Sequence, residues 1–497
     1  MSSKLIHVPL DPLDHLPRPT YIPNAFYFSI KPTVSPEQVF KHLQEGLYRA
    51  FLQVPWMNGR VHHQSSDTPG WRPGQLEIRY DPDVESTDNQ RCPQFKFNEL
   101  KSDAPYDDLK ARGFPLDVFT DEEVLWIPPS YVNSGVPDKG VEVVAAQANF
   151  MPGACILVSS MHHSACDATG MALFFKLWGD NCRVLSLQSQ GKPIPLPSMS
   201  SDNWDRTVLR RLWTKEAKEY SAMKTEPSIF PLIGLDRGSG DKDPFPLGRD
   251  RLPLRDNKMS TRVFYMSPMS FKKLVKQITN SGAAEFSGND VLVALLWQNL
   301  MKARIAARKK QGSDVAMDLD SLAELQVAQD ARPYFSQELP PFYVGNCCVH
   351  HRPTIPLGQL VGPDSSTAAV AQAIRDSARI VGHETTMDAY NLLRQIPDYA
   401  RLQPLRFLTV KDTFTISSLL LLPEVTPSFG DNVFLNGGCP EGSRPLMSNR
   451  NKSQVPVSYV MPRKKNGGIE FTLSLFEDEW PFLLADKEFG RYALLMA

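Results

Sequence analysis

The sequence predicts an α/β (α+β) protein of two domains, each a mixed sheet with flanking helices. The chain has 497 residues, which is too many for one ordinary hydrophobic core. Strand-like and helix-like segments alternate through both halves, as they do in mixed α/β domains. Residues 225–258 are rich in Pro, Gly, Ser and Asp, and we interpret them as a long crossing connection. We expect an N-terminal domain over residues 1–215 and a C-terminal domain over residues 216–497.

The N-terminal half opens with an aromatic, β-prone segment, and we predict a strand over residues 20–30. A helix follows, because Ser35 can cap it and Pro36 suits the first helical position. One face of this helix is apolar, at Val39, Leu43, Leu47 and Phe51. Further patterns predict a strand within 74–84, two strands within 141–163 around a turn at Pro152 and Gly153, and a helix over 170–182.

The C-terminal half shows the same mixture of periods. Its strongest helical pattern starts near Ser287 or Asn289 and ends at residue 310 in a basic run, which suits a helix C-terminus. The other predicted elements are helices over 204–224, 267–281 and 366–382, and strands over 261–267, 412–422 and 467–475. A second Pro- and Ser-rich loop is predicted over 190–204.

Composition excludes several functional classes. The 54 basic and 55 acidic residues leave a net charge of −1, whereas a nucleic-acid partner would favour a basic excess. The seven cysteines are scattered and form no CxxC pair, so we expect neither a disulfide framework nor a structural zinc site. No apolar run is long enough to cross a membrane, and the first residues lack a secretory signal. We therefore expect a cytoplasmic protein with no membrane partner.

The stretch MHHSACDATG carries the chemistry of the chain. His162 and His163 end the apolar strand ACILVSSM, and Asp167 follows in the next turn. Adjacent side chains of a strand point to opposite faces, so one histidine should face the interior and the other a cleft. A histidine beside a carboxylate suits general-base catalysis. Asp167 could pair with the histidine directly or brace the turn that orients it.

Other interpretations of these residues stay open at this point. A histidine in such a short pattern can simply be a core residue bonded to a backbone carbonyl. Cys166 could act as a nucleophile, although no glycine-rich elbow surrounds it. The pairs His62/His63, His162/His163 and His350/His351 could suggest a metal, but none has an HExxH-type partner, and we expect none.

The histidine segment resembles the HxxxDG motif of the BAHD acyltransferases, and more closely their fungal branch of trichothecene O-acetyltransferase-like enzymes. His163 and Asp167 match the motif, and Ala168 replaces its glycine. Four further segments resemble the family in order along the chain: LDPLDHLPRPTYIP, VPWMNGRV, FSGNDVLVALLWQNLMKAR and AQDARPYFSQELPPFYVGN. The family's TSW and DFGWG motifs correspond to residues 417–419 and to Ser428–Asn432, where only Phe429 and Gly430 are retained.

The resemblance implies two chloramphenicol-acetyltransferase-like domains with a channel between them. It implies a monomer that moves an acyl group, acetyl above all, from a coenzyme A thioester to a hydroxyl of a secondary metabolite. His163 would be the general base, and no resident cofactor is implied. The coenzyme A site would include Ser287, at the nucleotide end, and Ser417 and Ser418, either of which could stabilise the oxyanion. The alternatives are a simple helix cap for Ser287 and strand serines bonded to the backbone for the other two. Arg332 would be a partner of Asp167, with a surface arginine as the alternative.

The departures from the family leave two other functions open. The doublet HHxxxD also resembles the condensation domains of peptide synthetases, which share this fold. The altered Ser428–Asn432 segment could therefore belong to an enzyme that condenses or cyclises a polyketide or peptide without coenzyme A. A non-catalytic binding protein that keeps the channel is the third possibility.

Overall fold

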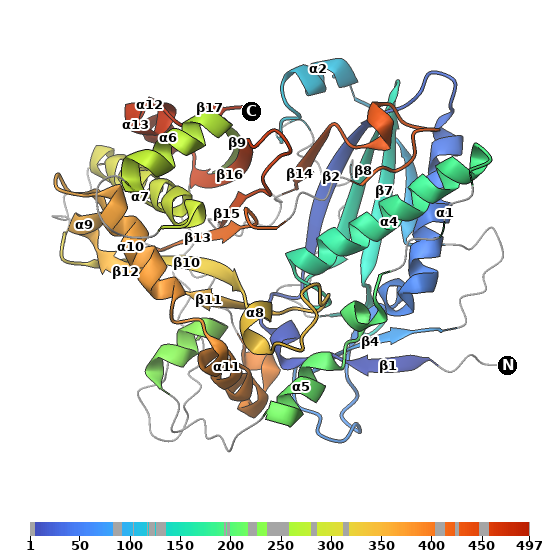
Figure 1. The fold of residues 1–497 in the computed structure, drawn as a ribbon, viewed down its shortest axis with the longest axis horizontal. Coiled ribbons are helices and arrows are strands. Elements are labelled where there is room, and N and C mark those ends of the chain that lie inside the picture. The colour runs from blue at the N-terminus through green and yellow to red at the C-terminus, as the bar shows by residue number, and fades with distance from the viewer. Residues whose placement is uncertain are drawn as a thin grey trace.

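In the computed structural model, the described residues form three β-sheets with helices around them (Figure 1). The structure describes residues 5–82, 92–102, 104–116, 118, 125, 136–192, 195, 199–216, 226–235, 258–279, 286–311, 318–402, 413–422, 427–446 and 457–496.

The sheet that carries the histidine pair has five strands in the order β14-β2-β8-β7-β5. They are β2 (Tyr21–Ser29), β5 (Phe95–Glu99), β7 (Val144–Met151), β8 (Ala154–His162) and β14 (Gly442–Pro445). β2 pairs antiparallel with β8, and Tyr21 lies opposite His162. β7 and β8 form a hairpin, and Gly153 in its turn has a φ of +73°, which suits glycine. The predicted strands over 20–30 and 141–163 are confirmed.

Helices α1 (Pro36–Gln53) and α4 (Ala168–Ser189) pack together on one face of this sheet (Figure 1). Ser35 caps α1 as predicted, and its Oγ accepts a hydrogen bond from the backbone N–H of Gln38. The four predicted apolar positions of α1 are all buried in the core beneath it. α4 is longer than the predicted helix over 170–182, because Asp167 caps it, so that the helix begins at Ala168, and its buried face continues to Ser186.

A smaller sheet of four strands has the order β1-β4-β3-β6. Its strands are β1 (Ile6–Pro9), β3 (Arg60–His63), β4 (Leu76–Tyr80) and β6 (Val141–Glu142). β4 confirms the strand predicted within 74–84. Between β1 and β2 the chain forms a short 3-10 helix, η1 (Pro12–His15), and the carboxylates of Asp14 and of its cap Asp11 are buried.

The third sheet lies in the C-terminal half and has eight strands. From one edge to the other they are β11 (Cys348–His351), β10 (Leu322–Asp330), β13 (Thr413–Ser418), β15 (Val457–Val460), β16 (Ile469–Phe476), β9 (Met259–Met266) and β17 (Leu494–Leu495). The eighth strand, β12 (Thr354–Pro356), pairs with β10. Its helices include α6 (Pro268–Thr279), α7 (Gly288–Lys310), α8 (Arg332–Phe335), α10 (Thr367–Ala378), α11 (His383–Gln395) and α12 (Trp480–Ala485). These elements confirm the helices predicted over 267–281, 287–310 and 366–382 and the strands over 261–267 and 467–475. β13 is shorter than the strand predicted over 412–422, since a turn begins at Leu419.

Part of the C-terminal half of the sequence belongs to the N-terminal unit of the fold. β14 belongs to the C-terminal half of the sequence, yet it forms the edge of the N-terminal sheet beside β2. Phe429, Val433 and Phe434 also belong to the hydrophobic core of the N-terminal half. The boundary between residues 215 and 216 stays a prediction, and residues 427–446 act as part of the N-terminal unit.

The predicted connection over 225–258 contains a packed segment. The 3-10 helix η6 (Pro227–Ile233) buries Phe230 and Ile233 against α11, because its IFPLI run is apolar. Of the helix predicted over 204–224, α5 (Val208–Glu216) is described, and residues 217–225 and 236–257 lie outside the described part.

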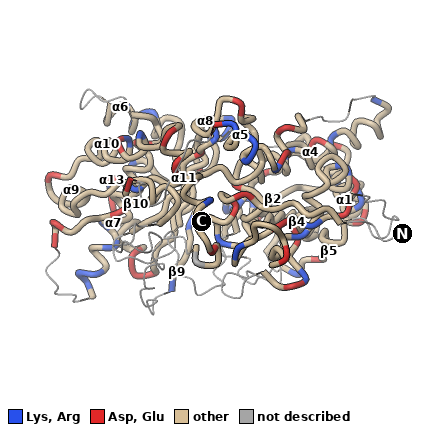
Figure 2. The backbone as a smooth tube through the Cα atoms, turned by 90° about the horizontal axis from the view of Figure 1, so that it is seen from below, with Lys and Arg blue, Asp and Glu red and all other residues tan. Residues whose placement is uncertain are grey.

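Charged residues of both signs are interspersed over the two halves of the molecule (Figure 2). The basic residues of α5 are partly paired, as Arg211 bonds to Asp205 and Lys215 to Glu338. In the described part of the chain, no helix combines the length and the apolarity that a membrane span needs.

Candidate active site

The two histidines stand at the end of β8 in different surroundings. The backbone N–H of His162 donates to Val143, at 2.9 Å, and that of His163 donates to Thr20, at 2.8 Å. The side chain of His162 is 1% exposed, whereas His163 is half-buried. The alternation of a strand therefore separates a buried ring from a partly accessible one.

The ring of His163 is held by its own turn. Its Nδ1 lies 3.2 Å from the carbonyl oxygen of Cys166. A carbonyl can only accept, so Nδ1 carries the hydrogen in this contact and Nε2 is the basic nitrogen of the neutral ring. The carbonyl contact anticipated for a core histidine is thus present, and its effect is to select a tautomer.

His162 is unsuited to proton transfer near neutral pH. Burial, and to a lesser extent the neighbouring His163, lower its pKa to about 3, so the ring stays neutral. It packs edge-on against Tyr21, with the ring centroids 5.3 Å apart. Of the two histidines, His163 is the candidate base.

Asp167 braces the turn. Its Oδ1 accepts from the backbone N–H groups of Thr169, at 3.1 Å, and Gly170, at 3.3 Å, and so caps α4. Nη2 of Arg332 lies 2.8 Å from both carboxylate oxygens, and the N–H of Cys347 donates to Oδ2 at 3.1 Å. Of the two roles left open for Asp167, these contacts correspond to bracing.

Arg332 is the expected partner of Asp167, and its guanidinium joins several segments. It is 3% exposed and also donates to Asp330 and to the carbonyls of Tyr343 and Gly345. The ion pair therefore ties the turn after β8 to residues 343–347 of the C-terminal half.

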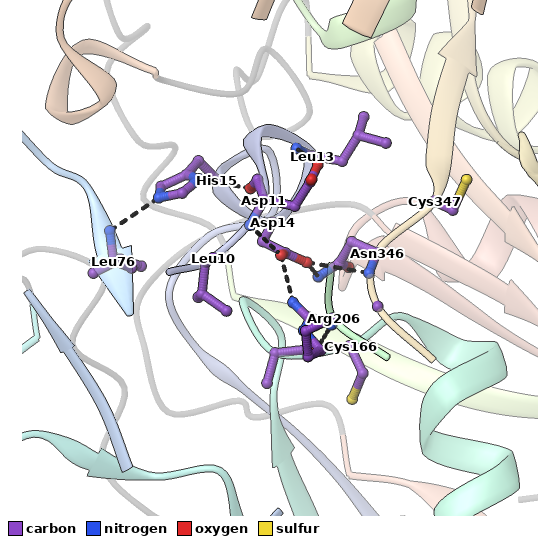
Figure 3. A network of polar contacts seen from close by, with 12 residues as sticks. Leu10, Asp11, Leu13, Asp14, His15, Leu76, Cys166, Arg206, Asn346 and Cys347 are labelled. Carbon is purple, nitrogen blue, oxygen red and sulfur yellow. Dashed lines mark hydrogen bonds and ion pairs between the residues drawn. The ribbon is translucent and has the colours of Figure 1, made fainter. Parts of the chain in front are cut away.

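A second buried ion pair beside this turn was missed by the sequence analysis. Asp14, on η1, pairs with Arg206 and also accepts a hydrogen bond from Asn346 (Figure 3), and Arg206 donates to the carbonyl of Ala165. Asp14 is 0% and Arg206 is 5% exposed. The residues lie 192 positions apart, and no spacing rule relates them. The only signal was the pair of acidic residues in LDPLD, which the fold buries.

Cys166 is a poor nucleophile. It is fully buried, and burial raises the pKa of its thiol well above the ordinary value, with the carboxylate of Asp167 adding to the effect. Among the described residues, no group of three or more His, Cys, Asp and Glu side chains is arranged to hold a metal ion.

Two of the three candidate coenzyme A residues meet at the start of α7. Ser287 caps this helix, and its Oγ accepts from the N–H of Asp290 at 3.1 Å. Ser418 ends β13, and its Oγ donates to Oδ1 of Asn289 at 2.6 Å. Ser417 precedes it on the other face of the strand and pairs with Tyr459 of β15. Ser417 and Ser418 belong to β13 of the C-terminal sheet and Ser287 to the cap of α7, whereas His163 and Asp167 lie in the turn that follows β8 of the N-terminal sheet.

The altered segment Ser428–Asn432 anchors a loop to α4 and α1. Phe429 is fully buried, packs against Phe28, Phe175 and Trp178, and accepts a hydrogen bond from Nε2 of His42 through its carbonyl, at 2.8 Å. Oδ1 of Asp431 accepts from Ser186 of α4 at 2.6 Å. The retained Phe-Gly pair thus serves packing.

Ser428 and Gly430 close this loop. The Ser428 hydroxyl donates to the carbonyl of Gly437 at 2.6 Å and accepts from the N–H of Gly430 at 3.3 Å. Gly430 has a φ of +105°, and a Cβ there would lie 2.7 Å from His42 Nε2. A serine therefore makes the local bonds at the position where the family carries aspartate.

Comparison with protein families gives two matches. Residues 20–182 match the trichothecene 3-O-acetyltransferase-like N-terminal domain, and residues 129–489 match the Transferase family. The second match covers well over half of the chain.

Three related sequences come from fungi. The chain is 28% identical to the isocyanide synthase-NRPS hybrid crmA of Aspergillus fumigatus over 95% of its own length, and it spans 30% of that larger protein. It is 25% identical to the acyltransferase BOA11 of Botryotinia fuckeliana, over 99% of this chain and 98% of the relative. Identity to the trichothecene 3-O-acetyltransferase TRI101 of Fusarium sporotrichioides is 24%, over 93% and 92%.

Solved structures share the fold. TRI101 of F. graminearum, complexed with ethyl coenzyme A, superimposes with a TM-score of 0.76 at 21% identity, over 99% of this chain and 100% of that one. The first condensation domain of the CDA synthetase gives a TM-score of 0.51 at 13% identity, over 94% and 90%. The predicted α/β class is confirmed. The family resemblance noted in the sequence is confirmed as well.

Proposed function

Because the chain belongs to the Transferase family, the BAHD acyltransferases, we propose that it moves an acyl group, acetyl above all, from a coenzyme A thioester to a hydroxyl of a small secondary metabolite. Relatives named as O-acetyltransferases over nearly the whole chain support this assignment. The observation that carries the mechanism is the contact between His163 Nδ1 and the carbonyl of Cys166, at 3.2 Å. It makes Nε2 the atom that accepts a proton.

An alcohol is a weak nucleophile at neutral pH, so a base must take its proton during attack. In the proposed reaction, Nε2 of His163 removes the hydroxyl proton while the oxygen attacks the thioester carbonyl. The tetrahedral intermediate then collapses, the carbon–sulfur bond breaks, and the proton passes from Nε2 to the departing thiolate. The products are the ester and free coenzyme A.

The oxyanion of the intermediate needs a hydrogen-bond donor within about 3 Å. Ser417 and Ser418 are the proposed donors, and their contacts rank them. The Ser418 hydroxyl hydrogen already points to Asn289, so using it would cost that bond. Ser417 is therefore the preferred donor, and Ser287 serves as the cap of the helix that would meet the nucleotide end of coenzyme A.

Acyl transfer is tested by mass spectrometry of products formed from a panel of acyl-CoAs and a host metabolite extract. We expect an ester product from the wild type, and a loss of rate by a factor of about 10² to 10⁴ in His163→Ala, the usual contribution of a general base. His162→Gln is the matched control, since its ring is buried, and it should keep most activity per folded molecule. Full activity of His163→Ala would remove this histidine from the mechanism.

A second candidate is a condensation or cyclisation enzyme that does not use coenzyme A. It is favoured by the match to crmA, a protein more than three times the length of the matched region. Calorimetry with coenzyme A separates the two: binding supports acyl transfer from coenzyme A, and no heat at millimolar ligand supports the alternative. We also propose a monomeric, cytoplasmic protein, which size-exclusion chromatography and cell fractionation would test.

A further inference from the structure

Two side chains from other parts of the sequence bond to the turn between β8 and α4. Three carbonyls of this turn, those of His163, Ala165 and Cys166, each contact a side chain. Asn346 Nδ2 donates to the carbonyl of His163 at 2.9 Å, and Arg206 Nη1 donates to that of Ala165 at 2.8 Å. The third carbonyl, of Cys166, is the one that contacts the His163 ring.

Asp14 connects these two side chains. Its Oδ1 accepts from Nδ2 of Asn346 at 3.0 Å and from the Asn346 backbone at 3.2 Å. Its Oδ2 forms the ion pair with Arg206. The two hydrogens of the Asn346 amide are thus divided between Asp14 and the carbonyl of His163.

The surroundings leave these groups little freedom. Asn346 is 2% exposed, and the Arg206 guanidinium stacks over Trp56, 5.2 Å from the ring centroid. The preceding residue must be small, because a Cβ on Gly345 would lie 2.4 Å from Arg206 Nη1. An arrangement this crowded holds the backbone of the turn in one position.

We propose that Asn346 and Arg206, joined through Asp14, are positioning residues for His163. They bond to the backbone at both ends of the segment 163–165 and so keep the Cys166 carbonyl beneath Nδ1. The inference rests on the proposed function of His163 as the base. It assigns to the Asp14–Arg206 pair a role separate from that of Asp167–Arg332, which caps α4.

The first test compares Asn346→Ala with Asn181→Ala. Asn181 is an equally buried asparagine of α4, whose amide donates to the carbonyl of Leu177 at 2.9 Å. We expect Asn346→Ala to lower kcat by about tenfold or more, as a displaced base does, with KM for acetyl-CoA unchanged. Asn181→Ala should keep kcat although its Tm also falls. Equal kcat in the two variants at equal loss of Tm would overturn the proposal.

A second variant tests the proposal independently, in case Asn346→Ala does not fold. Arg206→Lys keeps the charge opposite Asp14, but an ammonium cannot reproduce the two directed bonds of a guanidinium. We expect the same selective loss of kcat. Retention of wild-type kcat in this variant counts against the proposal.

A measurement without turnover separates this inference from the proposed function. In protein with ¹⁵N-labelled histidine, the ring signals of His163 are assigned by their absence in His163→Gln. We expect one tautomer, with the hydrogen on Nδ1, in the wild type and a mixture in Asn346→Ala. An unchanged tautomer refutes the positioning role even if acyl transfer is confirmed, while an inactive wild type with this tautomer shift refutes only the proposed function.

Discussion

At the residue scale, burial decides the chemistry of neighbouring side chains that are identical in type. His162 and His163 are adjacent, yet one ring is enclosed and the other is half-buried. Desolvation disfavours the charged imidazolium, so the enclosed ring cannot take a proton near neutral pH. The half-buried ring keeps Nε2 as a base, because the Cys166 carbonyl binds the other nitrogen.

The low pKa of His162 predicts a pH-dependent stability. The folded-state pKa is about 3 and the ordinary value is 6.5, so the unfolded chain binds the extra proton between these values. The free energy of unfolding therefore falls as the pH decreases below 6.5. Between pH 7 and pH 5 this one group should cost about 2 kcal/mol. His162→Gln should remove that part of the pH dependence, measured by urea unfolding at both pH values.

Asp11 acts in the opposite sense, since burial and the nearby Asp14 raise its pKa to about 7. The difference between wild type and His162→Gln is therefore the quantity to compare, because the contribution of Asp11 cancels in it. Identical pH dependence in the two proteins would contradict the expectation.

At the scale of elements, the segment 427–438 shows how a motif can change while its structural task persists. Phe429 fills the space between β2 and α4, and Gly430 provides a backbone conformation that other residues rarely adopt. Ser428 and Asp431 supply hydrogen bonds within the loop and to α4. The substituted residues of this motif therefore affect the anchoring of a loop, and none of them contributes to the contact of the His163 ring with Cys166.

Phe429→Ala should destabilise the protein strongly. The side chain is fully buried among three aromatic rings, so its removal leaves a cavity and should lower the free energy of unfolding by about 3–5 kcal/mol. Leu421→Ala is the control, because Leu421 is 82% exposed and should cost little. Similar unfolding midpoints for the two variants in urea would argue against this packing role.

At the scale of the whole molecule, the candidate site is held by charges that come from distant parts of the chain. The partners Asp167 and Arg332 lie 165 positions apart, and Asp14 and Arg206 lie 192 apart. All four are buried, so each charge depends on its partner. Buried charges that hold the candidate site therefore also join the two halves of the sequence, through the pair of Asp167 and Arg332.

Arg332→Gln should unfold the protein at lower denaturant, because it leaves the Asp167 carboxylate buried without a counter-charge. Breaking a buried pair in this way costs about 3–5 kcal/mol. Adding Asp167→Asn should recover part of that loss, since the double variant holds no unpaired charge. The coupling free energy from a double-mutant cycle measures this, and simple additivity of the two changes would contradict it.

The sequence by itself determined the elements whose signals are local. The helix from Pro36 follows from its cap and its apolar face, and the hairpin around Gly153 from its turn residues. The position of His163 at a strand end follows from the apolar run before it. Local periodicity reports which residues must be buried, because the residues of one buried face lie close together along the sequence.

Tertiary structure alone decided how these pieces meet. β10, β11 and α11 were not predicted, β14 joined a sheet of the other half, and Asp14 with Arg206 formed a contact that no pattern indicates. The bracing role of Asp167 also depended on where Arg332 lies. Each of these outcomes is set by pairing between residues far apart in sequence, and the free energy of such pairing depends on the distance between atoms, which spacing along a chain does not encode.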